Sequence, residues 1–360
     1  MKQTQKKNLM IMAAGTGGHI FPGLAIAEMM TARGWQVSWL GTTSGMECQI
    51  VPKHGVTMDS IDFSGMRGKG WKHTLVGAFK LCASFWNCRR ILMQRKPDVV
   101  LGMGGYVTVP GGIMAHLRGT PVVLMNADAA LLLSNKMLKP FASKLLFGLP
   151  SESMLSDNKT QVTGNPIRKE ICALPLPAQR YASRAGALRI LVVGGSLGAR
   201  VLNDCLPQAL ALIPEALRPQ VTHQSGKQNI DALRTSYQNA GVQAEILDFI
   251  DDMPRRYAEA DLVICRAGAI TISELTAAGV ASILVPFMAS STSHQKDNAV
   301  WMAQQKAAVH LPQTELKPAL LAAQLQALSR EQCLAMAQTA YALGQREASE
   351  NIATILEALA

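Results

Sequence analysis

The residues best placed to do chemistry follow two glycine-rich turns, one in each half of the chain. The first turn spans residues 15–19 (GTGGH) and the second spans residues 194–198 (GGSLG). Each comes after a short apolar run and before an amphipathic one, so each is predicted to join a strand to a helix. Such a turn brings backbone N–H groups and the positive end of the helix dipole close to a phosphate. A tight turn with no ligand is an equally good interpretation of either loop alone.

Dinucleotide and P-loop sites are disfavoured by the same segments. The third glycine of a dinucleotide fingerprint would fall at Ile20, and the next predicted strand, 36–40, leads into Gly41-Thr42-Thr43 without a ribose-binding acid. No Gly-x-x-x-x-Gly-Lys-Ser/Thr occurs in the chain. A third turn, residues 102–106 (GMGGY), follows another predicted strand and has enough glycine to hold a second anionic group. One phosphate-bearing ligand in each half is therefore predicted.

His19 is the candidate general base. It stands where the first loop turns into its helix, at the carboxyl end of a predicted strand. Imidazole titrates near neutral pH and is the side chain used most often for this task. A purely structural histidine remains the alternative.

A further glycine-containing turn, residues 266–274 (RAGAITISE), follows a strand in the second half and starts a helix. Its exposed amides are suited to a base or a phosphate, and Glu274 to the hydroxyls of a ribose. The alternative for Glu274 is an acid in the first turn of a helix, stabilised by the dipole. No Asp-x-Asp occurs, and the seven cysteines lack paired metal-ligand spacing, so no metal and no cofactor is predicted.

Strands and helices alternate along both halves, which predicts an α/β fold with parallel sheets. In the first half the strands are expected at 9–13, 36–40, 99–101 and 122–124, with a helix over 22–31. In the second half they are expected at 189–193, 220–223, 245–247, 262–265 and 282–285. Two Rossmann-like domains, 1–165 and 166–345, are predicted to face each other across a cleft, joined near residues 164–168. Residues 330–360 read as helical, and a last helix within 346–360 is expected to pack back on the first domain.

The positive charge lies entirely in the first half. The net charge is +10, with 18 Lys and Arg against 8 Asp and Glu in residues 1–165, and 17 against 17 in residues 166–360. This asymmetry predicts a surface for an acidic partner, which could be anionic lipid, nucleic acid or a phosphorylated substrate. No signal peptide and no spanning segment is predicted, and the odd, scattered cysteines suggest a reduced, cytoplasmic protein.

A basic amphipathic segment, residues 69–96, is the candidate membrane contact. Trp71, Leu75, Phe79, Cys82 and Trp86 recur at helical spacing among lysines and arginines. Apolar burial and charge attraction add at an anionic lipid surface, so a helix of this kind suits a peripheral membrane protein. The alternative is an ordinary helix packed on the sheet. Nucleic acid is disfavoured because no recognition motif accompanies the charge.

Several motifs together resemble the MurG family of N-acetylglucosaminyltransferases. They occur in the family's order and cover nearly the whole chain: 15–23, 96–100 with 102–106, 164–168, 194–196 with 198–200, 266–274, and His294-Gln295 with Asn298. The resemblance implies the GT-B architecture, with the acceptor in the first domain and UDP-N-acetylglucosamine mostly in the second. Residues 125–128 (MNAD) depart from the His-Glu-Gln-Asn common in the family, so the sugar-contacting position is Asp128 here.

The resemblance also assigns the site residues. Arg168 and Ser196 are expected at the diphosphate, Ile250 at the uracil, and Gln295 at the sugar hydroxyls. The full set of expected donor contacts is Thr16, Gly17, Gly18, Asp128, Arg168, Ser196, Ile250, Ala269, Ile270, Thr271, Ile272, Ser273, Glu274 and Gln295. The expected acceptor contacts are Gly104, Gly105 and Tyr106, and the expected catalytic residue is His19.

The function implied by the resemblance is a metal-independent, inverting transfer of N-acetylglucosamine to lipid I, giving lipid II on the cytoplasmic face of the inner membrane. Cell-wall and division proteins are implied as further partners. Two other functions stay open: a UDP-N-acetylglucosamine 2-epimerase of the same fold, and a non-catalytic UDP-sugar-binding scaffold.

Overall fold

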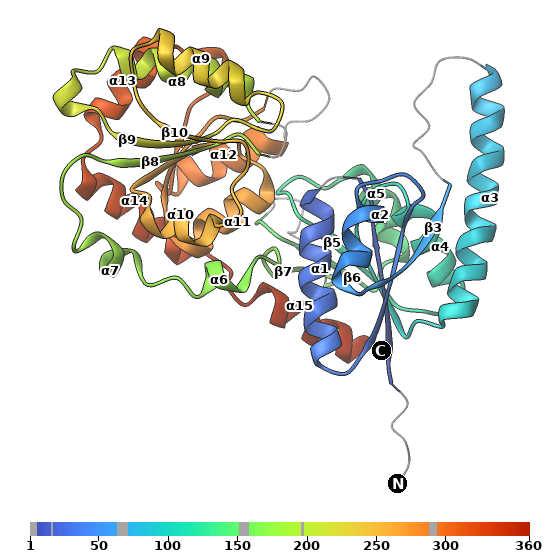
Figure 1. Cartoon of the computed structure of the whole chain (residues 1–360). Coiled ribbons are helices and arrows are strands. Elements are labelled where there is room, and N and C mark those ends of the chain that lie inside the picture. Colours follow the sequence, from blue (N-terminus) through green and yellow to red (C-terminus); the bar gives the residue numbers. More distant parts are fainter. Residues whose placement is uncertain (1–5, 16, 63–70, 151–157, 196–197, 288–293) are drawn as a thin grey trace. The chain divides into compact units, whose positions relative to one another are not determined.

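The computed structural model describes residues 6–15, 17–62, 71–150, 158–195, 198–287 and 294–360. The chain forms two compact units (Figure 1). The first contains residues 1–167 and 346–360, and the second contains residues 168–345. The division between residues 167 and 168 falls two residues after the expected boundary at 165/166, within the expected joint at residues 164–168.

The first unit is built on a seven-stranded parallel sheet in the order β3-β2-β1-β4-β5-β6-β7. Its strands are β1 (Asn8–Ala13), β2 (Gln36–Thr42), β3 (Thr57–Ile61), β4 (Val99–Gly104), β5 (Val122–Asn126), β6 (Lys144–Phe147) and β7 (Thr160–Val162). Its helices are α1 (Gly17–Ala32), α2 (Glu47–Ile50), α3 (Trp71–Arg95), α4 (Thr108–Leu117), α5 (Leu133–Leu138) and α15 (Ala348–Leu359), with 3-10 turns η1 (Val51–His54) and η2 (Lys139–Phe141).

Strand β1 shows why an unbroken apolar run becomes a central strand. Successive side chains of a strand point to opposite faces of the sheet. Leu9 and Ile11 accordingly enter the core on one face, whereas Met10 and Met12 enter the core on the other. Both faces of the strand are covered, so every position from Leu9 to Ala13 is apolar and buried, as is typical of parallel sheets.

Helix α1 begins at Gly17, five residues before the predicted start at Pro22. Proline is strongly favoured in the first turn of a helix, and this preference misplaced the boundary. Pro22 instead lies inside the helix and is buried. The earlier start places His19 within the first turn of α1.

Helix α15 returns to the first unit and packs against α1 (Figure 1). Ile352, Ala353 and Leu356 are buried in the same core as Ile20 of α1. Arg33, just after α1, pairs with Glu350 and with Glu357, the latter at 2.7 Å. Apolar burial and an ion-pair network therefore hold the end of the chain on the first unit.

The second unit contains a six-stranded parallel sheet in the order β10-β9-β8-β11-β12-β13. Its strands are β8 (Arg189–Val193), β9 (Gln220–Gln224), β10 (Glu245–Leu247), β11 (Leu262–Cys265), β12 (Ala281–Leu284) and β13 (Val309–His310). Its helices are α6 (Lys169–Cys172), α7 (Pro177–Tyr181), α8 (Arg200–Ala211), α9 (Ile230–Asn239), α10 (Met253–Glu259), α11 (Ala269–Ala278), α12 (His294–Gln304), α13 (Pro318–Ala327) and α14 (Arg330–Leu343), with 3-10 turns η4 (Glu215–Leu217) and η5 (Gln313–Glu315). The predicted class, two α/β units with parallel sheets, is confirmed.

Candidate functional site

The first glycine loop leaves the carboxyl end of β1 and carries His19. Gly15 has φ +102°, a backbone conformation that favours glycine. Nδ1 of His19 lies 3.3 Å from the carbonyl oxygen of Ala14. Because a carbonyl oxygen can only accept, Nδ1 carries the hydrogen and Nε2 keeps its lone pair. The half-buried His19 therefore presents the nitrogen that a general base requires.

Burial lowers the pKa of His19 below its ordinary value. The hydrogen bond to Ala14 and the negative charge of Asp128 act in the opposite direction. A lowered pKa keeps the ring neutral at physiological pH, which is the form that accepts a proton.

The third glycine turn packs directly against this loop. A Cβ on Gly104 would lie 2.8 Å from Nε2 of His19, and a Cβ on Gly105 would lie 2.5 Å from the Ala14 oxygen. Both glycines have positive φ. Close packing thus accounts for glycine at these two positions, whether or not they also contact an acceptor. Tyr106 is 51 % exposed at the same turn.

Two amides, one just before the first loop and one within it, are already engaged in the fold. The amide of Ala14 donates to the carbonyl of Gly104 at 3.3 Å. The amide of Gly15 donates to the buried carboxylate of Glu47 at 3.2 Å. Gly17 and Gly18 begin α1, and Gly18 is exposed. Thr16 lies outside the described residues.

Asp128 lies in the loop after β5, and Asn126 shapes that loop. The amide nitrogen of Asn126 donates to the carbonyls of Asp128 (2.6 Å) and Ala130 (3.1 Å), and its oxygen accepts from Leu132 N (2.9 Å). Asn126 is fully buried at the end of the strand. The loop that carries Asp128 is therefore held in place by hydrogen bonds to a residue of the sheet.

In the second unit, the amino end of α11 has the geometry of an anion-binding element. Its N-cap, Gly268, supplies no side-chain cap, and Ile272 N is the amide that donates to Gly268 O (2.9 Å). The three preceding amides, from Ala269 to Thr271, thus have no carbonyl within the helix. Ile272 is fully buried and Ser273 is 8 % exposed, so these two predicted contacts are limited mostly to backbone atoms.

Arg168 and Glu274 are brought together although they lie far apart in the sequence. Nη2 of Arg168 donates to Oε1 of Glu274 at 2.9 Å, and the hydroxyl of Tyr257 donates to Oε2 at 3.1 Å. The Arg168 side chain is 44 % exposed and that of Glu274 is 14 % exposed. Tyr257, buried in α10, was not predicted because nothing in its sequence position indicates a contact with α11.

Ile250, expected at the uracil, has a buried side chain. Only its backbone can contact a base. The neighbouring Phe249 is 42 % exposed at the carboxyl end of β10 and offers an aromatic face. Sequence reasoning missed Phe249, although an aromatic residue two positions after a predicted strand was a usable signal.

Gln295 is oriented by the loop after β12. Its Oε1 accepts from Phe287 N at 2.9 Å, which leaves its NH2 group as a donor. Arg266 stacks on the Phe287 ring at 5.3 Å and donates to Gln313 at 2.8 Å. Arg266 therefore has a structural part in supporting this loop.

The second glycine loop packs on the end of β9. A Cβ on Gly198 would lie 2.2 Å from the carbonyl oxygen of Ser225. That oxygen accepts from Asn203, whose own oxygen accepts from His223 Nε2 at 3.1 Å. Nδ1 of His223 lies 3.0 Å from the Tyr237 hydroxyl, and burial lowers the pKa of His223 to about 3. Ser196 lies outside the described residues.

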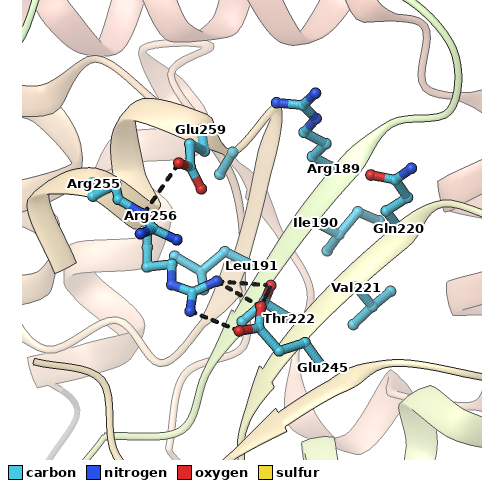
Figure 2. A pocket seen from close by; sticks show the side chains of 11 residues that line it. Arg189, Ile190, Leu191, Gln220, Val221, Thr222, Glu245, Arg255, Arg256 and Glu259 are labelled. Atoms are coloured by element: carbon cyan, nitrogen blue, oxygen red, sulfur yellow. Dashed lines mark hydrogen bonds and ion pairs between the residues drawn. The ribbon is translucent and has the colours of Figure 1, made fainter. Parts of the chain in front are cut away.

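The second unit contains a cavity of about 400 Å³, and Figure 2 shows the side chains that line it. It is lined by the first residues of β8 and β9, at the opposite ends of the strands from the glycine loops. Two ion pairs lie among its lining residues: Arg256 with Glu245 at 2.6 Å, and Arg255 with Glu259 at 3.1 Å. Ligands in open parallel sheets bind beyond the carboxyl ends of the strands. We therefore place the candidate site at the loops and not in this cavity.

Within the described part of the chain, no three His, Cys, Asp or Glu side chains converge as a metal site would require. The predicted independence from metal is left to experiment.

Comparisons with known proteins agree across both units. The glycosyltransferase family 28 N-terminal domain matches residues 9–147, and the family 28 C-terminal domain matches residues 189–354. A UDP-N-acetylglucosamine--N-acetylmuramyl-(pentapeptide) pyrophosphoryl-undecaprenol N-acetylglucosamine transferase from Janthinobacterium sp. (strain Marseille) is 67 % identical, with 98 % of this chain and 99 % of the relative covered. The same transferase from Herminiimonas arsenicoxydans is 66 % identical with the same coverage. Among solved structures, Acinetobacter baumannii MurG is similar at a TM-score of 0.86 and 34 % identity, covering 98 % and 99 % of the two chains.

Proposed function

The chain belongs to glycosyltransferase family 28 and, within it, to the MurG transferases, and from this premise we propose how its residues carry out the family's reaction. The reaction moves N-acetylglucosamine from UDP-N-acetylglucosamine to lipid I and gives lipid II, a step of peptidoglycan synthesis. The likeness that carries this conclusion extends over both units. The predicted family, GT-B fold and activity are confirmed.

The donor binds, in our proposal, at the carboxyl ends of the strands of the second unit. The amides at the start of α11, which have no carbonyl partner within the helix, and the guanidinium of Arg168 hold the diphosphate. Glu274, oriented by Tyr257, accepts from the ribose hydroxyls, and Phe249 stacks on the uracil beside the Ile250 backbone. Gln295 donates to the sugar. The exposure and hydrogen bonding of Arg168, Glu274, Phe249 and Gln295 support these roles, whereas Ile250, Ile272 and Ser273 have buried side chains and are limited mostly to backbone contacts.

In the transfer itself, Nε2 of His19 takes the proton of the acceptor 4-hydroxyl. The hydroxyl oxygen then attacks the anomeric carbon, the bond to the UDP oxygen breaks, and the configuration inverts. The leaving diphosphate gains negative charge, which fixed amide dipoles and Arg168 stabilise. The tautomer set by Ala14 supports this role for His19.

In our proposal, an exposed apolar surface of the first unit contacts the membrane that holds the acceptor's lipid. On α3, Ser84, Cys88 and Leu92 are buried, whereas Trp86 (66 % exposed) and Met93 (44 %) face outward. Helix α4 contacts both α3 and α5, and these neighbours add further exposed apolar side chains, Leu117, Leu133 and Met137. Exposed basic residues stand among them: Arg89, Arg90, Arg118 and Lys136.

Apolar side chains ringed by lysine and arginine suit the interfacial region of an anionic bilayer. No described helix is long and apolar enough to cross a membrane. We propose that the chain binds the cytoplasmic face of the inner membrane peripherally through this surface. Cell-wall and division proteins stay a proposal drawn from the family alone.

The deciding assay follows radiolabel from UDP-N-acetylglucosamine into a lipid I analogue, with and without EDTA. Transfer that persists in EDTA is the expected result. Loss of transfer in EDTA would contradict the metal-independent reaction. Epimerised UDP-sugar without lipid labelling would indicate an isomerase, and binding of UDP-sugar without either product would indicate a scaffold.

A further inference from the structure

The side chain of Glu47 is fully buried. Within the described part of the chain, the groups that donate hydrogen bonds to its carboxylate are uncharged. Glu47 is the first residue of α2, and its Oε1 accepts from the amide (3.0 Å) and the hydroxyl (2.6 Å) of Thr42 at the end of β2. Its Oε2 accepts from the amide of Gly15 at 3.2 Å. Among the described residues no lysine, arginine or histidine pairs with it. An isolated buried charge is costly unless hydrogen bonds compensate it, so this arrangement calls for a reason beyond packing.

The surroundings of Glu47 are shaped to hold the carboxylate. A Cβ on Gly45 would lie 2.2 Å from both carboxylate oxygens, and a Cβ on Gly41 would lie 2.8 Å from Cγ. Burial alone raises the pKa of Glu47, but the hydrogen bonds from Thr42 and Gly15 outweigh it and bring the pKa below its ordinary value. The carboxylate therefore stays ionised throughout the physiological pH range.

The peptide group that Glu47 binds is the one that binds His19. The N–H of Gly15 and the C=O of Ala14 belong to a single planar unit, and they point in opposite directions. Glu47 accepts from the N–H on one side, and Nδ1 of His19 donates to the C=O on the other. Hydrogen bonds in series polarise one another. A negatively charged carboxylate that accepts from the Gly15 N–H therefore makes the Ala14 carbonyl a stronger acceptor.

We propose that Glu47 is a positioning residue that acts on His19 through the Ala14–Gly15 peptide group. It fixes the orientation of that peptide, and thereby the Nδ1–H tautomer that leaves Nε2 as the base. When Nε2 takes the acceptor's proton, the ring becomes positive, and the polarised Ala14 carbonyl stabilises it. Glu47 has no exposed surface and does not touch substrate, so its effect reaches the reaction only through this peptide. The inference rests on His19 being the base in the proposed function.

The test compares Glu47→Gln with Glu350→Gln, the same chemical change at an exposed position of the same unit. A glutamine keeps the size but removes the charge and replaces one acceptor by a donor. We expect kcat to fall about tenfold, a part of what general-base catalysis contributes. We also expect ¹⁵N NMR to show His19 losing its single tautomer, with its titration midpoint moved to lower pH. Glu350→Gln should change neither quantity.

A double-mutant cycle with His19→Ala separates this role from a merely structural one. If Glu47 acts through His19, Glu47→Gln costs little further in the His19→Ala background. Equal losses in both backgrounds would overturn the proposal, as would unchanged kcat and unchanged His19 nitrogen shifts. If His19→Ala alone kept full turnover, the base of the proposed function would be wrong, while the nitrogen shifts would still decide whether Glu47 governs His19.

One further measurement uses the unmodified chain, so its result does not depend on whether the variants fold. The Gly15 amide should exchange slowly with solvent and resonate downfield, as a charge-assisted hydrogen bond requires. Rapid exchange at Gly15 would overturn the proposal without any substitution.

Discussion

At the residue scale, the site is defined by backbone groups that neighbouring side chains hold in place. The Ala14–Gly15 peptide lies between Glu47 and His19, and Gly104 leaves room for the His19 ring. In the second unit, His223 supports Asn203 and, through it, the Ser225 carbonyl on which Gly198 packs. Even conservative substitutions at these positions are therefore expected to alter catalysis or the pH dependence of stability.

Gly104→Ala should reduce kcat by at least about tenfold, because its methyl would lie 2.8 Å from Nε2 of His19 and displace the ring. Alanine at φ +120° also costs about 1–3 kcal/mol of stability. The control is Gly119→Ala, at φ +76° with nothing within 4 Å of its Cβ. Steady-state kinetics beside denaturant unfolding should show both variants destabilised and only Gly104→Ala slow. Equal kcat values would refute the contact.

His223 should make the chain less stable in acid. The pKa of His223 is lowered to about 3 in the fold, whereas an unfolded histidine titrates near 6.5. The unfolded chain thus binds the proton first, so stability is full above about pH 6.5 and falls as pH drops towards 3. Between pH 7 and pH 5 the loss from this residue should be about 2 kcal/mol.

Denaturant unfolding of the wild type and His223→Gln at both pH values measures this contribution. The stability advantage of the wild type over the variant should shrink by about 2 kcal/mol between pH 7 and pH 5. A constant difference between the two proteins would mean that His223 does not titrate as burial requires.

At the element scale, the sequence pattern located the central strands well and the edge strands poorly. Strands β8 and β11 have their predicted bounds, because each is a largely buried apolar run. The edge strand β10 is an exception, since its bounds were also predicted although none of its residues is buried. Strands β3, β6, β7 and β13 were not predicted. They lie at or near the sheet edges, and the hydrophobic pattern of β3 and β7 is weak. Helix α15 has buried Ile352, Ala353 and Leu356 on one face, which explains its attachment to α1.

Arg33→Ala should lower stability by about 1 kcal/mol, because the pairs with Glu350 and Glu357 are partly exposed and therefore weakened by solvent. The loss should shrink at high salt, as the charges become screened. Arg234→Ala, which breaks a more exposed pair with Asp231, is the control and should have little effect. Thermal or denaturant unfolding at low and high salt measures both. An effect of Arg33→Ala that does not depend on salt would point to packing instead.

At the scale of the whole molecule, the two units differ in charge and in surface. The excess positive charge belongs to the first half of the chain. The outward face of α3, with α4 and α5, adds exposed Trp86, Leu133 and Met137 to that charge. This combination makes the first unit the membrane-binding one in our proposal.

Leu133→Asp and Trp86→Asp should each weaken binding to phosphatidylglycerol vesicles by about fivefold or more, since each removes apolar burial and adds a repelled charge. Leu217→Asp is the matched control, because Leu217 is 67 % exposed and Leu133 is 74 % exposed, but Leu217 lies in the second unit. Vesicle flotation measures binding. Equal loss with Leu217→Asp, or equal binding to neutral vesicles, would contradict the proposed surface.

The sequence alone determined the fold class, the family and the loops that carry the candidate site. Apolar runs, glycine turns and motif order are local properties of the chain, and the spacing of strands and helices follows from them. Gly15, His19, Gly104 and Glu274 were all recognisable in this way.

Only the tertiary structure decided which of these residues meet. Residues from different strands and helices come into contact in the fold: Glu47 with Gly15, His19 with Gly104, and both Tyr257 and Arg168 with Glu274. Burial was also decided there, since Ile250 and Ile272 look available in the sequence but are buried in the fold. Such contacts arise because the parallel strands bring the loops at their carboxyl ends to one edge of the sheet, and no spacing along the chain encodes which side chains then touch.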